Sequence, residues 1–432
     1  MSSPKRSLKE PRIYRKLAPL AGPNLQAALG LLLALGPVSD EDARSAVARI
    51  APKLATARGL PFHGPLPARA LPPAEMRRAL AGSLAGADTA RQDAILRRLG
   101  LLPAGGDSAD LALATFAASP LPHYDPVTRR LLIPDAPALD KQELLIAHEI
   151  AHAIADERFG IRRTLGIASD GRHELDGDAE RARLAVIEGD ATLATLTFAD
   201  PRETFLGARE LASVADRLAN TQSGWLAALS RFTHIDGLLF TARVRARNPW
   251  SAVNALWVDP PASTEQVLHP EKYEACAAPV AVDLSLFPAL PDLGPPTATD
   301  VLGELVARSW LAKSLPPDLA ERAATGWGGD RAALYRAPQG VDRRTSEDLQ
   351  LLAWFTIWDD PADAADFVRA AKLAGATTAE RRADAVALLF GARDDASRLT
   401  AALFDAWRDL KTARQKLTRR ARPAPPCART TR

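Results

Sequence analysis

The residues best suited to chemistry in this 432-residue chain are His148, Glu149 and His152, which form the pattern His-Glu-x-x-His. On an α-helix, two residues four positions apart lie on one face, about 6 Å apart along the axis, so both imidazoles can reach one metal ion. The glutamate is rotated about 100° from the first histidine and can act on a water beside that ion. The pattern therefore predicts Zn²⁺ ligands at His148 and His152 and a general base at Glu149.

The alternative interpretation is a chance match, in which both histidines are hydrogen-bonded residues of an amphipathic helix. The chain contains seven histidines, so the pairing of two of them around a glutamate favours the metal site. Two cysteines, Cys276 and Cys427, are too few for a disulfide framework or a cysteine-ligated metal. Histidine and carboxylate groups must therefore hold any zinc.

The metal helix is expected over residues 139–160. Asp140 followed by Glu143 resembles a capping box at its start, and Gly160 is a typical helix stop. A hairpin is predicted just upstream, over residues 121–134, because Asp-Pro marks a turn before a short aliphatic run. One of its strands either offers an open edge to an extended peptide or is a plain structural element.

A second helix, expected over residues 176–198, carries Glu188 inside an apolar, alanine-rich stretch. A buried carboxylate needs a partner, and a metal would supply one, so Glu188 is the predicted third ligand. The alternative is a solvated glutamate on an exposed face. Gly189 predicts that the backbone passes close to another group here, and Asp178 and Asp190 are both candidates for receiving the N–H of a ligand histidine.

The chain resembles the gluzincin branch of zinc metallopeptidases, and more closely a family of poorly characterised prokaryotic, often exported, predicted metallopeptidases. The matching segments are the His148 helix and residues 124–126, 188–191, 263–273 and 326–331. The resemblance implies a zinc-dependent hydrolase that cleaves a peptide or protein substrate. One departure is Thr192, because the best-known gluzincins carry an aspartate four residues after the ligand glutamate.

In gluzincins a downstream histidine or tyrosine often stabilises the oxyanion, so the resemblance makes His269 and Tyr273 catalytic candidates, with His234 behind them. The alternative for His269 is a hydrogen-bonded loop residue. The alternative for the whole protein is a catalytically inactive zinc-binding or surface-interaction protein of the same fold.

The expected fold class is α+β, with a helical zincin-like catalytic core followed by a C-terminal mixed region. The predicted C-terminal elements are a Gly-rich turn leading into a strand over 327–335, strands over 351–358 and 384–390, and helices over 300–311, 361–373 and up to residue 410. The expected divisions are a leader (1–38), a helical lead-in (39–110), the metal-binding core (111–295), the α+β region (296–410) and a basic disordered tail (411–432).

Charge is concentrated at the two ends. Residues 1–16 carry six Lys/Arg against one acid and residues 411–432 carry eight and no acid, so the body between them is net acidic. This excludes nucleic acid as a partner of the folded body, because tracking phosphates needs clustered Lys/Arg. The basic start followed by an apolar run over 25–38 favours an exported protein with a membrane contact only through this leader, and the alternative is a first helix of a cytoplasmic protein. The oligomeric state is left open.

Overall fold

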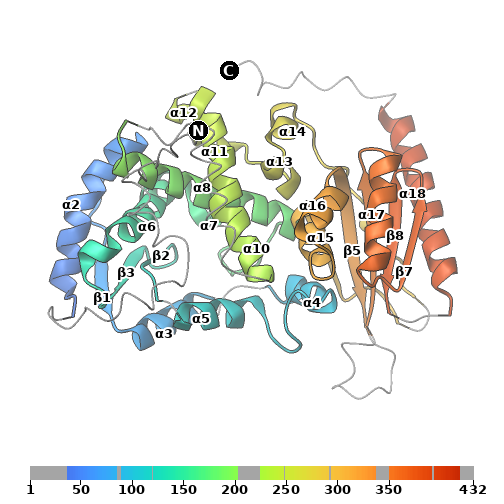
Figure 1. The fold of residues 1–432 in the computed structure, drawn as a ribbon, viewed down its shortest axis with the longest axis horizontal. Coiled ribbons are helices and arrows are strands. Elements are labelled where there is room, and N and C mark those ends of the chain that lie inside the picture. Colours follow the sequence, from blue (N-terminus) through green and yellow to red (C-terminus); the bar gives the residue numbers. More distant parts are fainter. Residues whose placement is uncertain are drawn as a thin grey trace, which may run out of the picture.

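The computed structural model describes residues 37–84, 89–118, 120–202, 224–247, 249–290, 293–336, 350–391 and 394–418. The expected leader lies outside these ranges except for its last two residues. The fold is α+β, as predicted: helices and a small sheet make up the part before residue 290, and a larger sheet with its own helices makes up the rest (Figure 1).

The small sheet confirms the predicted hairpin. Strands β2 (His123–Asp125) and β3 (Arg130–Pro134) pair in antiparallel fashion, and β1 (Ala68–Leu71) pairs with β3 in parallel. The turn is stabilised by Asp125, whose carboxylate accepts hydrogen bonds from the Val127 N–H and the Thr128 hydroxyl. The strand order β1-β3-β2 leaves β2 at an edge of this sheet.

Three long helices pack together beside this sheet: α2 (Asp40–Arg58), α6 (Leu139–Phe159) and α8 (Gly177–Ala199). A capping box of Ser39 and Asp42 begins α2, and the helix continues through Pro52 to Gly59. Apolar side chains of α2, α6, α8 and the small sheet form one core cluster. Helix α2 of the expected lead-in therefore packs directly on α6, which carries His148 and His152.

The start of α6 corrects one expectation. Its N-cap is Ala138, which has no side-chain cap, so Asp140 and Glu143 do not form a capping box. Glu143 instead accepts a 2.6 Å hydrogen bond from Arg49 of α2. Glu143, which the local pattern assigned to the cap, therefore contacts α2 instead.

Shorter helices connect these elements. They are α3 (Pro73–Leu84), α4 (Ala90–Arg98), α5 (Ser108–Ala118), α7 (Ile161–Thr164), α10 (Trp225–Arg231), the π-helical turn η4 (Phe232–Asp236), α11 (Gly237–Arg247), α12 (Trp250–Val258), α13 (Thr264–Leu268), α14 (Pro270–Glu274) and the 3-10 turn η5 (Leu284–Leu286). None of the described helices is long and apolar enough to cross a membrane.

The larger sheet is antiparallel throughout, in the order β4-β5-β6-β8-β7. Its strands are β4 (Ala298–Asp300), β5 (Trp327–Tyr335), β6 (Leu351–Trp358), β7 (Thr378–Arg382) and β8 (Ala385–Phe390). Its helices are α15 (Gly303–Leu311), α16 (Pro317–Ala324), α17 (Pro361–Leu373) and α18 (Ala396–Thr418). The sequence predicted β6, β8 and α17 closely, and the segment expected as a turn leading into a strand is strand β5 throughout. It missed β4 and β7: Asp300, expected to begin a helix, ends β4, and α15 begins at Gly303.

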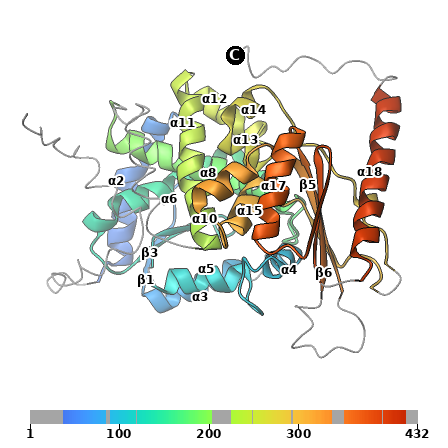
Figure 2. The ribbon, with the colours of Figure 1, turned by 45° about the vertical axis from the view of Figure 1, so that its right-hand side comes forward.

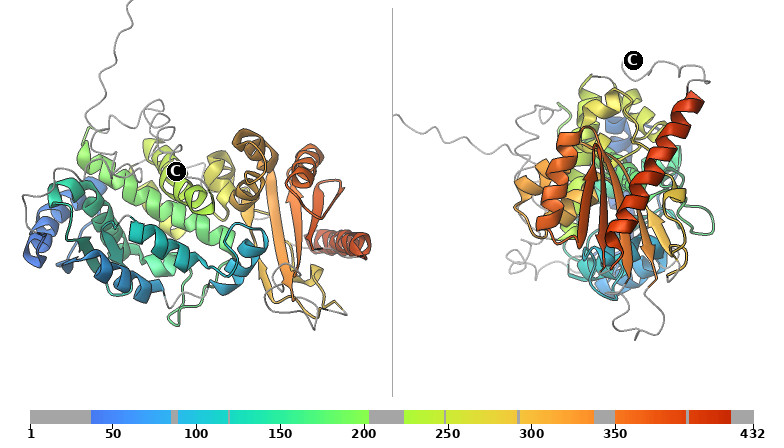
Figure 3. Two further views of the ribbon diagram at one scale, coloured as in Figure 1. Left: turned by 60° about the horizontal axis from the view of Figure 1, so that its bottom comes forward. Right: turned by 90° about the vertical axis from the view of Figure 1, so that its right-hand side faces the viewer.

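Figures 2 and 3 show α17 and α18 on opposite faces of this sheet. Because neighbouring strand residues point to opposite faces, Trp354 of β6 packs in one core cluster with Phe367 of α17, and Phe355 packs in another with Phe404 of α18. This explains why β6 is buried along its whole length. Residues 411–418 continue α18, so the expected disordered tail does not begin at residue 411.

Candidate metal centre

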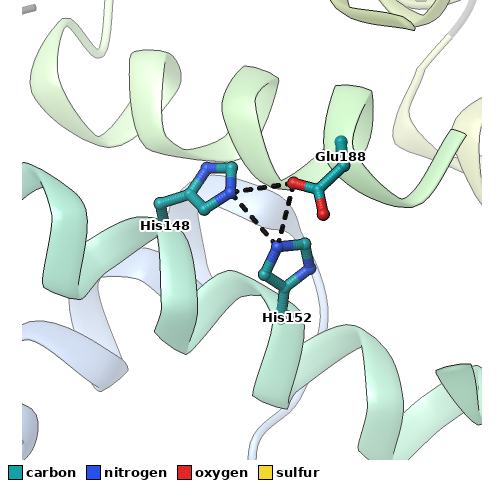
Figure 4. A group of neighbouring side chains, drawn as sticks. All are labelled: His148, His152 and Glu188. Carbon is teal, nitrogen blue, oxygen red and sulfur yellow. Dashed lines mark hydrogen bonds and ion pairs between the residues drawn. The ribbon is translucent and has the colours of Figure 1, made fainter. Parts of the chain in front are cut away.

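His148, His152 and Glu188 come together where α6 and α8 pack against each other (Figure 4). The Nε2 atoms of the two histidines are 3.1 Å apart. The Glu188 Oε2 atom lies 3.1 Å from Nε2 of His148 and 3.2 Å from Nε2 of His152. The structure therefore brings the three predicted ligand side chains to one point, forming what is called the triad below.

The spacing of the triad fits a zinc ion. Two ligand atoms about 2.0–2.1 Å from a tetrahedral zinc are about 3.4 Å apart, close to the three separations in the triad. Hydrogen bonds alone satisfy such a triangle poorly, because each imidazole Nε2 can donate or accept only along one direction. A cation at the centre would interact with all three atoms at once.

Burial and charge put two members of the triad in ligand-competent forms. Burial lowers the pKa of His148 to about 4, so this imidazole is neutral at pH 7. Burial opposes ionisation of Glu188, but the positive charges of His152 and His234 outweigh it and hold the pKa of the carboxyl well below its usual value. Burial likewise opposes a charge on His152, yet Glu188 beside it raises the pKa to about 9. Binding of a metal ion here would therefore release a proton from His152.

Glu149 is held between the metal helix and the hairpin. Its Oε2 accepts a 2.6 Å hydrogen bond from the backbone N–H of Tyr124 in β2. Burial, only partly offset by nearby positive charge and this hydrogen bond, raises the pKa of Glu149 to about 7. The Tyr124 hydroxyl donates to Asp156 at 2.8 Å, which fixes β2 to α6 a second time. A carboxylate with a pKa near neutrality is suited to accept and return a proton.

His234 is the additional histidine that the fold places against the triad. Its Nε2 lies 3.3 Å from Oε2 of Glu188, and its ring stacks on His148 with a centroid distance of 5.9 Å. The group that could hold a metal ion consists of His148, His152 and Glu188, whose ligand atoms all lie within 4.8 Å of one another, and His234 is not part of it. His234 is also half-exposed, and it belongs to the π-helical turn η4, a type of turn frequent at functional sites.

Two glycines, Gly189 in α8 and Gly237 where η4 passes into α11, allow this junction to approach α8. A Cβ atom on Gly189 would lie 2.3 Å from the carbonyl oxygen of Gly237, and one on Gly237 would lie 2.2 Å from that of Ala185. Only glycine permits backbones to cross this closely. The close approach predicted at Gly189 is therefore confirmed, and it is the contact that brings His234 next to Glu188.

His269 and Tyr273 make polar contacts with other residues. His269 Nε2 is 3.0 Å from Glu304 of α15, and the Tyr273 hydroxyl donates to the carbonyl of Asp259 at 2.7 Å. Among the described residues, these contacts tie α13 and α14 to their neighbours, so the structure does not bring His269 or Tyr273 to the triad. His234, the lower-ranked candidate for the same role, is the one that contacts Glu188.

The two acids considered as partners of the ligand histidines also lie elsewhere. Asp178 accepts hydrogen bonds from the backbone and hydroxyl of Thr264, and Asp190 accepts from Arg58 and Trp257. In the part of the chain that the structure describes, the Nδ1 atoms of both triad histidines have no hydrogen-bond partner. Neither acid therefore has the expected contact.

The sequence segment 326–331, which had no assigned role, organises the C-terminal region. Asp330 accepts hydrogen bonds from the backbone N–H groups of Leu302 and Gly303 at the start of α15, and from the Trp327 indole. Arg331 donates to Asp176 at the start of α8. This segment therefore links the C-terminal sheet to the helix that carries Glu188.

Sequence reasoning missed two residues near the triad. Burial lowers the pKa of His123 in β2, and the nearby charges of Asp125, His152 and Glu188 also affect this pKa. Arg58, at the end of α2, forms the buried ion pair with Asp190. His123 belongs to the hairpin that the sequence did predict, whereas no local pattern connects Arg58 with a residue 132 positions away.

A family model described as "Domain of unknown function (DUF8575)" matches residues 292–407. The match covers the larger sheet and most of its helices, close to the expected α+β region of residues 296–410, and it does not include the triad. No curated protein and no solved structure matches the chain.

Proposed function

We propose that this protein is a zinc-dependent peptidase whose helical part is a zincin-like, gluzincin-type catalytic core. The observation that carries the proposal is the triad of His148, His152 and Glu188, with spacings suited to zinc, beside the carboxylate of Glu149. A histidine and glutamate donor set with three protein ligands is typical of catalytic zinc sites, which keep a position open for water or substrate.

Zinc, when bound by the triad, supplies Lewis acidity that makes a water more acidic and polarises a substrate carbonyl. Glu149 takes the proton of the attacking water and passes it to the leaving amine of the cleaved peptide bond. Its raised pKa of about 7 suits both transfers near neutral pH. His234, half-exposed beside Glu188, donates a hydrogen bond to the oxygen that becomes negative during attack.

The proposed substrate is an extended peptide. Strand β2 lies at an edge of its sheet, and the N–H of Tyr124 on this strand contacts Glu149. A peptide that runs along this edge would bring its scissile bond to the catalytic carboxylate, with main-chain hydrogen bonds providing affinity. Export of the enzyme, proposed from its basic and apolar leader, would expose it to extracytoplasmic proteins.

The test combines metal analysis with a matched pair of variants. The purified protein is expected to contain one zinc per chain and to cleave casein or a peptide mixture in a chelator-sensitive manner. Glu149→Gln should keep the zinc and lose activity by about 10²-fold or more. Glu143→Gln, a change of a more exposed glutamate on the same helix, should retain both.

Two results would contradict the proposal. A protein without zinc would exclude the metal site, and a zinc-loaded protein in which Glu149→Gln cleaves as fast as the parent would exclude this mechanism. Stoichiometric zinc without any chelator-sensitive cleavage would instead identify a catalytically inactive zinc-binding protein.

A further inference from the structure

The turn of the hairpin β2–β3 contains a residue in an unusual backbone conformation. Arg129, the last residue of the turn over 126–129, has a φ of +52°, in the left-handed region. Glycine adopts this region without cost, whereas residues with a side chain are uncommon there. Strained residues of this kind cluster at functional sites. An arginine at this position therefore indicates that its side chain contributes something that glycine could not.

The Arg129 side chain is 71% exposed and has one distant counter-charge. Within the described part of the chain, Asp156 on α6 is the one acid at ion-pair distance, with Nε to Oδ2 at 3.9 Å. The same carboxylate already accepts hydrogen bonds from the Tyr124 hydroxyl at 2.8 Å and the Ile161 N–H at 2.6 Å. Because an exposed ion pair contributes little to stability, this contact does not explain the strained arginine. Its guanidinium has N–H donors for another acceptor.

The charges around the turn are arranged with the positive groups outside. Arg130 follows Arg129 in the chain, begins β3 and is also exposed. The two nearby acids, Asp125 and Asp156, are each only 5% exposed. Asp125 lies opposite Arg130 in the register, and its carboxylate accepts hydrogen bonds within the turn. A molecule that approaches this end of the hairpin from solvent therefore meets two guanidinium groups first.

Arg129 lies along the peptide path proposed above. The Tyr124 N–H donates to Glu149, so Glu149 lies at the edge of β2 that faces away from β3. Asp156, which Arg129 contacts, follows Glu149 by seven positions on α6. This separation is about 10 Å along the helix axis at 1.5 Å per residue. Because an extended peptide advances about 3.3 Å per residue, Arg129 is about three peptide residues away from Glu149.

We propose that Arg129 selects peptides that carry an acidic side chain about three residues from the scissile bond. The inference rests on the proposed peptidase function and adds a substrate class to it. A guanidinium group pairs with a carboxylate through two parallel N–H donors, which gives the contact a defined geometry. Arg130 adds attraction at longer range. A lysine or arginine side chain at the same position of the peptide is repelled by both residues.

Binding of fluorescent peptides to the full-length Glu149→Gln protein tests this proposal, because no cleavage is expected in that background. Two peptides are compared that differ only in carrying glutamates or lysines about three residues to either side of the centre. The glutamate peptide should bind about fivefold more tightly at low salt, and high salt should reduce the difference. Adding Arg129→Glu should reverse the preference. Adding Arg129→Gly should abolish it without lowering the unfolding midpoint, since glycine fits the φ of +52°.

The matched control is Arg69→Glu, which changes an exposed arginine of β1, at the other edge of the same sheet, that lies 3.7 Å from Asp40. This variant should keep the preference for the glutamate peptide.

Equal binding of the two peptides overturns the proposal, as does an unchanged preference in Arg129→Glu or a reversal in Arg69→Glu. So does the absence of saturable binding of either peptide up to about 1 mM. Chelator-sensitive cleavage by the parent is measured separately. An active enzyme without the charge preference refutes only the role of Arg129. A zinc-loaded protein that has the preference but does not cleave refutes the peptidase function and supports Arg129 as a peptide-binding residue.

Discussion

Arg58 at the end of α2 forms a two-point ion pair with Asp190 in α8, with Nε to Oδ1 at 2.5 Å and Nη2 to Oδ2 at 2.8 Å. Both side chains are only 2% exposed, and the Trp257 indole donates to the same carboxylate at 2.8 Å. Asp190 lies two residues after Glu188. The pair therefore fixes the rotation and register of α8 at the point where this helix contributes to the triad.

The first prediction concerns this ion pair. Arg58→Met leaves Asp190 buried without its cationic partner, which costs about 3–5 kcal/mol, and should weaken zinc binding because α8 is no longer held in register. Chelator competition measures the affinity, and urea unfolding measures the stability. Arg58→Met combined with Asp190→Asn should regain part of the stability. Loss of stability with unchanged zinc affinity would show that the pair has no influence on the triad.

The second prediction separates a substrate-contacting role of His234 from a metal-ligand role. His234→Ala should lower kcat by about 10²–10³-fold, the usual effect of removing an oxyanion donor, with zinc content unchanged. His63→Ala, which changes an exposed histidine paired with Glu157, is the matched control and should be silent. Loss of zinc from the His234→Ala protein would make His234 a ligand and refute the assignment.

The third prediction tests the glycine crossing of α8 with the junction of η4 and α11. Gly189→Ala puts a methyl group 2.3 Å from the Gly237 carbonyl oxygen and should destabilise the protein by about 1–3 kcal/mol or more, with reduced peptidase activity. Gly82→Ala is the control, because a Cβ at this helical position of α3 meets nothing within 4 Å. Gly82→Ala should stabilise by about 0.5–1 kcal/mol. Equal effects of the two changes would show that the crossing tolerates a side chain.

The fourth prediction is a pH dependence of stability that originates at Asp178. Burial raises the pKa of this carboxyl from its ordinary value of 3.8 to about 7, despite the hydrogen bonds from Thr264. Between about pH 4 and pH 7, Asp178 is protonated in the folded protein and ionised in the unfolded chain. The free energy of unfolding therefore decreases as pH rises through this window. One such group changes stability by at most about 1.4 kcal/mol per pH unit.

Urea unfolding of the parent and Asp178→Asn at pH 5, 6, 7 and 8 checks this expectation. The variant cannot titrate at this position, so its stability should decrease less steeply between pH 5 and pH 7. Asp140→Asn, an exposed change on α6, should reproduce the slope of the parent. An unchanged slope in Asp178→Asn would exclude this carboxyl as a source of the pH dependence.

Sequence patterns predicted the elements whose structure depends on nearby residues. The histidine pair on α6, the hairpin β2–β3 and the apolar strand β6 all follow from helical or strand periodicity, and the structure has each of them near its expected bounds. Sequence patterns gave wrong predictions where residues distant in the sequence determine the local structure. Glu143 contacts Arg49 instead of capping its own helix, and β7 is formed by pairing with β8 although Glu380, Arg381 and Arg382 are charged.

The sequence by itself determined that His148 and His152 share one face of a helix with Glu149 between them, because this spacing is a property of the α-helix. It also named Glu188 as their companion from its apolar surroundings. Only the tertiary structure decided that Glu188 contacts both imidazoles and His234. The same packing places His269 beside Glu304 and the Tyr273 hydroxyl beside the carbonyl of Asp259. The physical reason is that the rotation and crossing of helices are set by packing between distant residues, here Arg58 on Asp190 and Gly189 against Gly237.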